Sequence, residues 1–388
     1  MNDDERLGHR LYRLVEEYAA LGPHRSGTAG DARTGDWFAA ELERRGGRVE
    51  RQAFSLDRYE ATATVTIDGW EVPSLPLFYE GTGAVASDRP HVAAVATLDG
   101  DRASSALEAT IAEARAAGAA VAVITCVNPL SELQVPNRAP SKGDGIPVLL
   151  VPGAVAAALG AGRVNVDFPG AIIRGTSANV IAEFGQGSEA PIVIATPLSG
   201  WFGCAAERGT GIAVAIELAS RIAATRPVLV VGSSGHEILP YVGLEAFLLR
   251  HETLAASLVA HLGANLALAV RADATGELRL APGVASSRGL PASYRALKVR
   301  MQPDVCERLT PIFAEIDLPP IVHPAKWSGE AQAWARATDA SLLSSVGMGP
   351  AFHTPADVPA DATSAVLLDR VCSAIAAAIE VAVPAPDR

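Results

Sequence analysis

The stretch "PIVIATPLSGWFGCAAERGTGIAVAIELASRIAATRPVLVVGSS", residues 191–234, decides the fold. Two short apolar runs, 191–196 and 227–234, are typical of buried strands, and residues 207–224 between them carry a helical apolar pattern. A strand, a helix and a second strand in this order indicate a parallel pair joined by a crossover helix. Because both strands are apolar on both faces, the sheet is expected to be covered by helices on both sides.

The same alternation continues on either side of this stretch. Further apolar runs predict strands at residues 47–56, 179–184, 257–263 and 319–323, and helical patterns cover residues 4–21, 31–45, 240–251, 304–316, 328–337 and 364–382. Alternating strands and helices predict an α/β fold with a mostly parallel sheet sandwiched by helices.

A smaller α/β module is expected to interrupt this pattern. Strand-like runs, an Ala-rich helical segment and a long Pro/Gly/Asn loop occupy residues 91–98, 104–119, 120–126, 128–145 and 145–160. The predicted domains are therefore residues 1–58 with 176–388, and an inserted domain of residues 59–175.

Composition excludes several classes of protein. With 49% hydrophobic and 19% charged residues among 388, the chain is that of a globular protein. A net charge of −11 argues against a nucleic-acid partner. The start, MNDDERLGHR, lacks the apolar core of a signal peptide, and no apolar run is long enough to span a bilayer. We expect a cytoplasmic protein without a membrane partner, with a homodimer as the default assembly.

The four cysteines are far apart in the sequence and form no C-x-x-C pair. They are Cys126, Cys204, Cys306 and Cys372. This spacing predicts buried thiols rather than a disulfide framework or a thiolate zinc site.

Polar residues follow three of the predicted segments. In parallel sheets, ligands bind just beyond the carboxyl ends of the strands. They are Thr196, Ser199, Trp201, Glu207 and Arg208 after the first strand, His236 and Glu237 after "VLVVGSSG", and His353 and Asp357 in the loop "GPAFHTPADVP". Two carboxylates and one imidazole, Glu207, Glu237 and His353, make an acceptable zinc set with an open position. The alternatives are a solvated turn for His236–Glu237, a structural histidine for His353 and a helix-dipole partner for Glu207.

At this point the chain resembles the family-28 metallopeptidases, the zinc aminopeptidase and glutaminyl cyclase type. "PHRSGTAGDARTGDWFAAELERRGGRVERQAF" is similar to the family's amino-terminal helix and strand. "ARAAGAAVAVIT" and "IPVLLVPGAVAAAL" look like parts of an inserted protease-associated domain. "FHTPADVP" resembles the loop that carries the family's last histidine ligand.

The resemblance implies two zinc ions that share a bridging aspartate, with a glutamate as general base. In this chain Thr196 stands where the first histidine ligand is expected, Leu198 where the aspartate of that His-x-Asp motif is expected, and Gly263 where a later aspartate is expected. The resemblance further implies that Glu207 replaces the bridging aspartate, while Glu237 and His353 are retained as ligands. The expected base has become His236. The chain is therefore expected to hold one zinc or similar divalent ion.

The other site residues keep more than one reading. His236 could take a proton from metal-bound water or become a further ligand. Arg208 could supply the lost positive charge, bind a substrate carboxylate, or form a surface ion pair. Ser199 and Trp201 are predicted to line the altered position. Within "KWSGEAQAW", Trp327 and Glu330 are candidate pocket residues.

Three functions follow from these residues. The first is a one-metal hydrolase of an amide or peptide-like bond in a small substrate, with His236, Glu207 and Arg208 as catalytic groups. The second is a non-hydrolytic lyase, cyclase or isomerase that uses His/Glu acid–base chemistry. The third is a binding protein that has kept the pocket without catalysis.

Overall fold

The computed structural model describes residues 3–96, 100–136, 141–238, 240–272, 275–286 and 288–384. The chain divides into two compact units. The first comprises Met1–Phe54, Thr176–Gly349 and Asp357–Arg388, and the second comprises Ser55–Gly175 and Pro350–Ala356.

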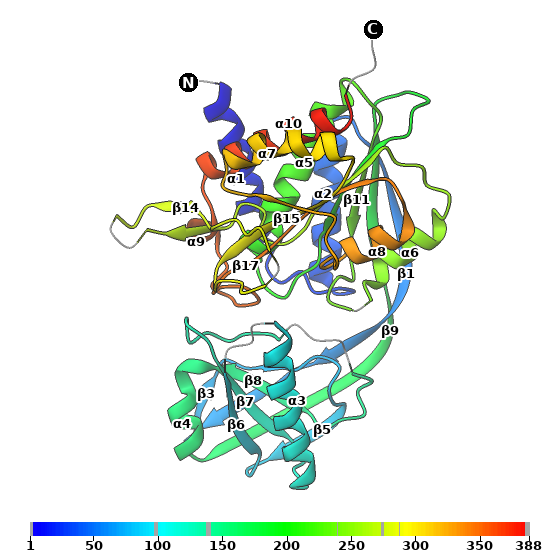
Figure 1. Cartoon of the computed structure of the whole chain (residues 1–388). Coiled ribbons are helices and arrows are strands. Elements are labelled where there is room, and N and C mark those ends of the chain that lie inside the picture. The colour runs from blue at the N-terminus through cyan, green and yellow to red at the C-terminus, as the bar shows by residue number, and fades with distance from the viewer. Residues whose placement is uncertain are drawn as a thin grey trace. The chain divides into compact units, whose positions relative to one another are not determined.

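A mixed, mostly parallel sheet forms the centre of the first unit (Figure 1). Its strands follow the order β16-β15-β17-β12-β10-β11-β9, and β1 also pairs with β9. β10 is parallel to both β11 and β12, β12 is parallel to β17, and β15 is parallel to β16. β9 and β15 run antiparallel to their neighbours β11 and β17. The strands are β1 (Arg48–Ala61), β9 (Val164–Phe184), β10 (Ile192–Pro197), β11 (Val228–Ser233), β12 (Leu258–Leu262), β15 (Tyr294–Arg300), β16 (Pro320–Val322) and β17 (Ser341–Met348).

Alternate residues of these strands enter two different apolar cores. Ile192 and Ile194 of β10 pack on one face of the sheet, whereas Val193 and Ala195 pack on the other. Because side chains of a strand point alternately to opposite faces, an all-apolar strand needs helices on both sides. The prediction of a sheet sandwiched by helices is therefore confirmed.

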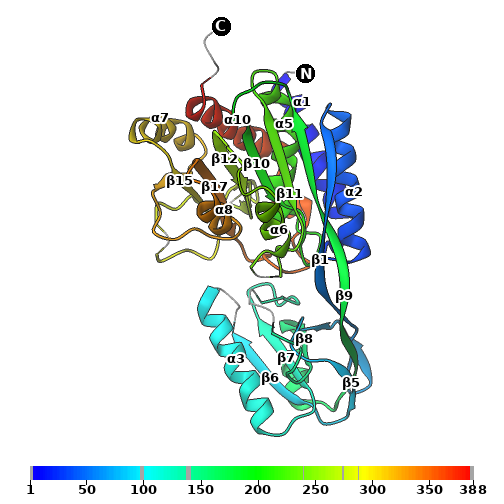
Figure 2. The same ribbon diagram turned by 90° about the vertical axis from the view of Figure 1, so that its right-hand side faces the viewer.

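The helices are distributed unequally over the two faces. Apolar residues of α1, α2, α5, α7 and α10 join the larger core, and residues of α6 and α8 join the smaller one (Figure 2). The helical elements of this unit are α1 (Asp3–Ala20), α2 (Ala29–Arg44), the π-helical turn η2 (Ala205–Gly209), α5 (Thr210–Ala223), α6 (Val242–Arg250), α7 (Pro303–Ala314), α8 (Ala331–Ala337), α9 (Pro359–Ala362) and α10 (Ala365–Ala382).

Several strands lie where the sequence pattern gave no strand. β15 and β17 pair over seven residues, Tyr294–Arg300 with Leu342–Met348, and a hairpin joins β13 (Ala269–Arg271) to β14 (Leu278–Leu280). β9 is 21 residues long, although only residues 179–184 were predicted as strand. Pro169, Gly170 and Gly175 interrupt the apolar pattern of its first part. The partner strands β5 (Gly83–Ser87) and β2 (Thr64–Ile67) hold that part extended.

The second unit is the smaller α/β module, and β1 and β9 continue into it. Its strands β6, β7 and β8 are parallel, and β4 adds to β8 antiparallel. Leu107, Ile111 and Ala114 of α3 pack with Ile124 of β7 and Leu150 of β8 in one core. The elements are β2 (Thr64–Ile67), β3 (Trp70–Val72), β4 (Leu75–Pro76), β5 (Gly83–Ser87), β6 (His91–Ala96), α3 (Gly100–Ala116), β7 (Ala122–Val127), β8 (Val148–Pro152), η1 (Gly153–Val155) and α4 (Ala156–Ala161).

All four cysteines are buried free thiols, as the spacing predicted. Across the described ranges, no helix is long and apolar enough to cross a membrane. The predicted loop 128–145 includes residues 137–140, which lie outside the described residues, as do residues 97 and 98 of the run 91–98.

Candidate functional site

The turn that follows β10 is wound as a π-helical segment before α5 begins. Cys204 enters it in a left-handed conformation with φ 46°, and its carbonyl accepts the N–H groups of Arg208 and Gly209 at 2.9 and 3.0 Å. The carboxylate of Asp357 accepts the N–H groups of Ala206 and Glu207 at 2.8 and 3.0 Å. Such segments often occur at functional sites, and here the turn carries Glu207 and Arg208.

Arg208 is fixed by three contacts inside the first unit. Its Nη2 lies 3.0 Å from Glu207 Oε1 and 3.4 Å from Glu237 Oε1. Its Nε donates to the carbonyl oxygen of Ser199 at 2.9 Å. The side chain is only 2% exposed, and those of Glu207 and Glu237 are 0% and 3% exposed. Burial alone lowers the pKa of Arg208, but Glu207 and Glu237 raise it above its usual value, so the guanidinium stays charged.

The turn that follows β11 presents His236 and Glu237. Gly235 has φ 81°, and a Cβ there would lie 2.6 Å from Val242 Cγ1, so the turn needs glycine. The N–H of His236 donates to Ser199 Oγ at 3.1 Å. The side chain of His236 is 17% exposed, so the ring reaches solvent at one side.

Glu330 orients the imidazole of His236. Its Oε1 lies 3.2 Å from His236 Nδ1, and Ser233 Oγ lies 2.8 and 2.7 Å from its two oxygens. When Glu330 is ionised, Nδ1 of the neutral ring donates to it, and Nε2 carries the lone pair. Burial raises the pKa of Glu330, while His261, Ser233 and Arg208 lower it in part. A carboxylate that fixes the tautomer of an imidazole is the arrangement that makes histidine a general base.

A network of hydroxyl groups around Asp31 supports the same turn. Ser234 Oγ donates to Asp31 Oδ1 at 2.7 Å, and Ser177 Oγ donates to Oδ2 at 2.5 Å. Ser26 Oγ accepts the N–H of Gly235 at 3.1 Å and lies 3.4 Å from Glu237 Oε2. Burial raises the pKa of Asp31, and these donors lower it in part. Asp31 is 6% exposed, which indicates a structural role.

Sequence reasoning missed His261, the last residue but one of β12. Its Nδ1 lies 2.9 Å from Ser344 Oγ, its Nε2 is buried without a hydrogen-bond partner, and the residue is 1% exposed. Burial lowers its pKa to about 4, and Glu330 is the largest influence that opposes this shift. The apolar–His–apolar pattern "VAHL" was the available signal.

No sequence pattern pointed to a role for Ser26, Asp31 or Ser233. Ser26 lies in the turn before α2, Asp31 in the first turn of α2 and Ser233 at the end of β11, and small polar residues are common at such positions. Their importance follows from partners more than 90 residues away in the chain, which no local pattern records.

The remaining predicted pocket residues are distributed around this turn. Trp201 and Trp327 are half-buried, and Trp327 packs against the smaller core of the sheet. Lys298 Nζ donates to Lys326 O and Ser328 Oγ, both at 2.8 Å, and so holds the segment that leads to Glu330. Thr196, predicted to replace a ligand, donates its hydroxyl to Leu262 O at 2.9 Å.

His353 belongs to the second unit and is described there by itself. Its Nδ1 donates to Val135 O at 3.1 Å, and its carbonyl accepts the N–H of Val135 at 3.0 Å. The ring stacks on Phe352 at a centroid distance of 3.9 Å, and the residue is 5% exposed. Since Glu207 and Glu237 belong to the first unit, the three-residue zinc set remains a prediction.

The carboxylates of the first unit do not fit a zinc ion while Arg208 lies between them. Zinc binds carboxylate oxygens at about 2.0–2.2 Å, and the Nη2 of Arg208 is in ion-pair contact with one oxygen of each. In the part of the chain that the structure describes, no group of three or more His, Cys, Asp or Glu side chains is arranged to hold an ion.

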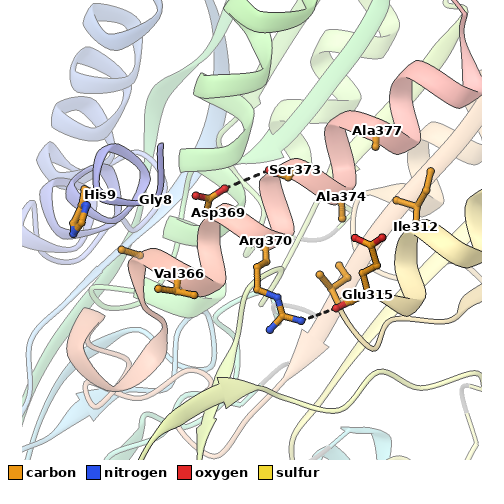
Figure 3. A pocket seen from close by; sticks show the side chains of 12 residues that line it. Gly8, His9, Ile312, Glu315, Val366, Asp369, Arg370, Ser373, Ala374 and Ala377 are labelled. Carbon is orange, nitrogen blue, oxygen red and sulfur yellow. Dashed lines mark hydrogen bonds between the residues drawn. The ribbon is translucent and has the colours of Figure 1, made fainter. Parts of the chain in front are cut away.

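A cavity of about 860 Å³ lies elsewhere in the first unit, between α1, α7 and α10 (Figure 3). In its wall, Arg370 donates to the carbonyl of Glu315 at 2.5 Å, and Ser373 donates to Asp369 at 3.3 Å. Its lining comes from the helices, whereas the groups with catalytic potential follow the strands. We therefore place the candidate site at the strand ends, despite the size of this cavity.

Comparisons with known proteins agree on the architecture. No protein-family model matches the sequence, and no curated protein is significantly similar to it. Among solved structures, a zinc aminopeptidase from Bacillus subtilis is similar with a TM-score of 0.70 and 15% identity, over 96% of this chain and 94% of that one. A peptidase M28 precursor from Shewanella amazonensis gives a TM-score of 0.70 and 16% identity over 99% and 98%.

A glutaminyl cyclase from Tannerella forsythia is similar with a TM-score of 0.50 and 12% identity, over 96% of this chain and 97% of that one. At these identities the likeness concerns the fold. The chain therefore has the fold of the family-28 zinc aminopeptidases.

Proposed function

We propose that the strand-end site of the first unit catalyses a proton-transfer reaction on a small amide- or peptide-like substrate. His236 is the general base and Glu330 orients it. This proposal rests mainly on the 3.2 Å contact between His236 Nδ1 and Glu330 Oε1, together with the 17% exposure of the His236 side chain. An imidazole that is oriented by a carboxylate and open to solvent can take a proton near neutral pH.

The reaction class that fits these groups best is a cyclase, lyase or isomerase. In such reactions a base removes a proton from the substrate itself, so a metal-bound water is not needed. A glutaminyl cyclase is one of the proteins with a similar fold, which makes amino-terminal glutaminyl peptides a suitable first substrate class. Half-buried Trp201 and Trp327 are the proposed apolar contacts for such a substrate.

The competing proposal is the one-zinc hydrolase, with Glu207, Glu237 and His353 as ligands. Its support is the fold shared with zinc aminopeptidases. The contacts of Arg208 with both carboxylates weigh against it. A cytoplasmic location, a homodimer and a small-molecule or short peptide-like substrate remain proposals from the sequence.

The test is turnover of a panel of glutaminyl peptides and aminoacyl anilides before and after dialysis against EDTA. We expect activity on a glutaminyl peptide that survives EDTA, with little or none on the anilides. His236→Gln should lower kcat by about 10²–10⁴-fold. His251→Gln is the matched control, because His251 stacks on Phe247 after α6 and should leave kcat unchanged.

Two results would contradict the proposal. Activity that EDTA removes and zinc restores would favour the one-zinc hydrolase. Inactivity on the whole panel by a folded protein would exclude the proposed substrate class.

A further inference from the structure

The Arg208 guanidinium contacts three groups through their oxygen atoms. Glu207 Oε1 and Glu237 Oε1 contact Nη2 at 3.0 and 3.4 Å, and Ser199 O accepts from Nε at 2.9 Å. Two carboxylates and a carbonyl are donors that divalent cations accept in proteins. The chain thus surrounds one of its own side chains with groups that commonly surround an ion.

We propose that Arg208 is a built-in cation that keeps divalent metal ions out of this strand end. The guanidinium is covalently attached to the chain and is positively charged at every physiological pH. The turn that carries it is held in place by the hydrogen bonds to Asp357. An ion added beside it would meet a buried like charge at close range, where repulsion is weakly screened.

This role explains why the two glutamates can be buried together. Two carboxylates at this depth repel each other and lose their hydration, so they need a positive partner. Arg208 provides that partner without a ligand from solution. The inference deepens the proposed function, because a base that works without a metal still needs these carboxylates to be neutralised.

The experiment measures metal binding rather than turnover, so it can fail independently of the proposed function. Wild-type protein and the Glu237→Gln variant, both stripped with EDTA, are dialysed to equilibrium against zinc. We expect the same zinc content in both, since Glu237 is already engaged by Arg208. A zinc ion bound by wild type and lost in Glu237→Gln would overturn the proposal.

A second part of the experiment removes the guanidinium from between Glu207 and Glu237. Arg208→Ala should gain one zinc per chain, with at least tenfold tighter binding than wild type, and zinc should raise its Tm. The double variant Arg208→Ala with Glu237→Gln should lose that gain, and Arg208→Lys, which keeps a positive charge, should resemble wild type. If Arg208→Ala folds and gains no zinc, the carboxylates are not a closed metal position and the inference is wrong. If Arg208→Ala fails to fold even with zinc, the comparison of wild type with Glu237→Gln decides.

Discussion

Two carboxylate arrangements at the carboxyl ends of one sheet differ in the partner that neutralises them. Glu207 and Glu237 share the guanidinium of Arg208, whereas Glu330 is bonded to the hydroxyl of Ser233 and the imidazole of His236. A guanidinium does not release its proton in proteins, but an imidazole exchanges its proton near neutral pH. The fixed charge and the mobile proton are thus separated, although His236 and Glu237 are adjacent in the chain.

The largest expected effect breaks the fixed-charge arrangement. Arg208→Met leaves two buried carboxylates without a positive partner, and such a loss costs about 3–5 kcal/mol in the free energy of unfolding. Urea denaturation of the EDTA-treated variant and of wild type measures this difference. A double variant that also carries Glu237→Gln should recover part of it, because one uncompensated charge is removed. A loss below about 1 kcal/mol would show that Arg208 is not needed to neutralise the pair.

The second expected effect is a pH dependence of the free energy of unfolding, which comes from a titratable imidazole and not from the permanently charged Arg208. Burial lowers the pKa of His261 to about 4, so between about pH 6.5 and pH 4 the unfolded chain binds more protons than the native one. Stability is therefore complete above pH 6.5 and falls as the pH drops through this window, by about 3 kcal/mol for this group. Glu330, whose pKa burial raises, acts in the opposite direction.

Urea unfolding at several pH values compares wild type with His261→Asn. The variant should lose most of this acid sensitivity, whereas Arg208→Lys should keep it. If the free energy of unfolding of His261→Asn falls with decreasing pH as steeply as that of wild type, His261 is not buried as a neutral base.

The smallest expected effect comes from removing the Ser233 hydroxyl, which donates to Glu330 beside His236. Ser233→Ala removes the donor that lies 2.8 and 2.7 Å from the two oxygens of Glu330. A lost hydrogen bond to a charged group costs about 1.5–3 kcal/mol when its partner stays buried and unsatisfied, and His236 still contacts Glu330, so we expect the lower end. Thermal unfolding measures it, with Ser257→Ala as a control, because Ser257 donates only to a carbonyl at 3.2 Å outside this site. Equal losses in the two variants would contradict a special role for Ser233.

The architecture of the first unit was accessible from the sequence because its strands are apolar on both faces. β10, β11 and β12 follow from short apolar runs, and α5 and α6 follow from the helical segments between these runs. Strands such as β17, "SLLSSVGM", were missed. Its Ser344, Ser345 and Gly347 are buried because the strand pairs with β12 and β15, which no local pattern records.

The site was only partly accessible. His236, Glu237, Glu207 and Arg208 were found because they follow apolar strands. Glu330 was predicted as a pocket residue, but its hydrogen bond with Ser233 was not, since the two are 97 residues apart and the pairing depends on how the sheet places them. Adjacent Glu207 and Arg208 also gave no hint that one guanidinium would serve Glu237, 29 residues later.

The cap that Asp357 provides has a consequence for the order in which the protein is made. The amides of Ala206 and Glu207 emerge about 150 residues before the carboxylate that binds them. A chain that has been synthesised only to a point before Asp357 lacks the partner for these amides, so we expect Arg208 to be held between its glutamates only once Asp357 is available. A ribosome-bound fragment that ends before residue 357 should therefore carry an open, acidic strand end, and the completed chain should close it.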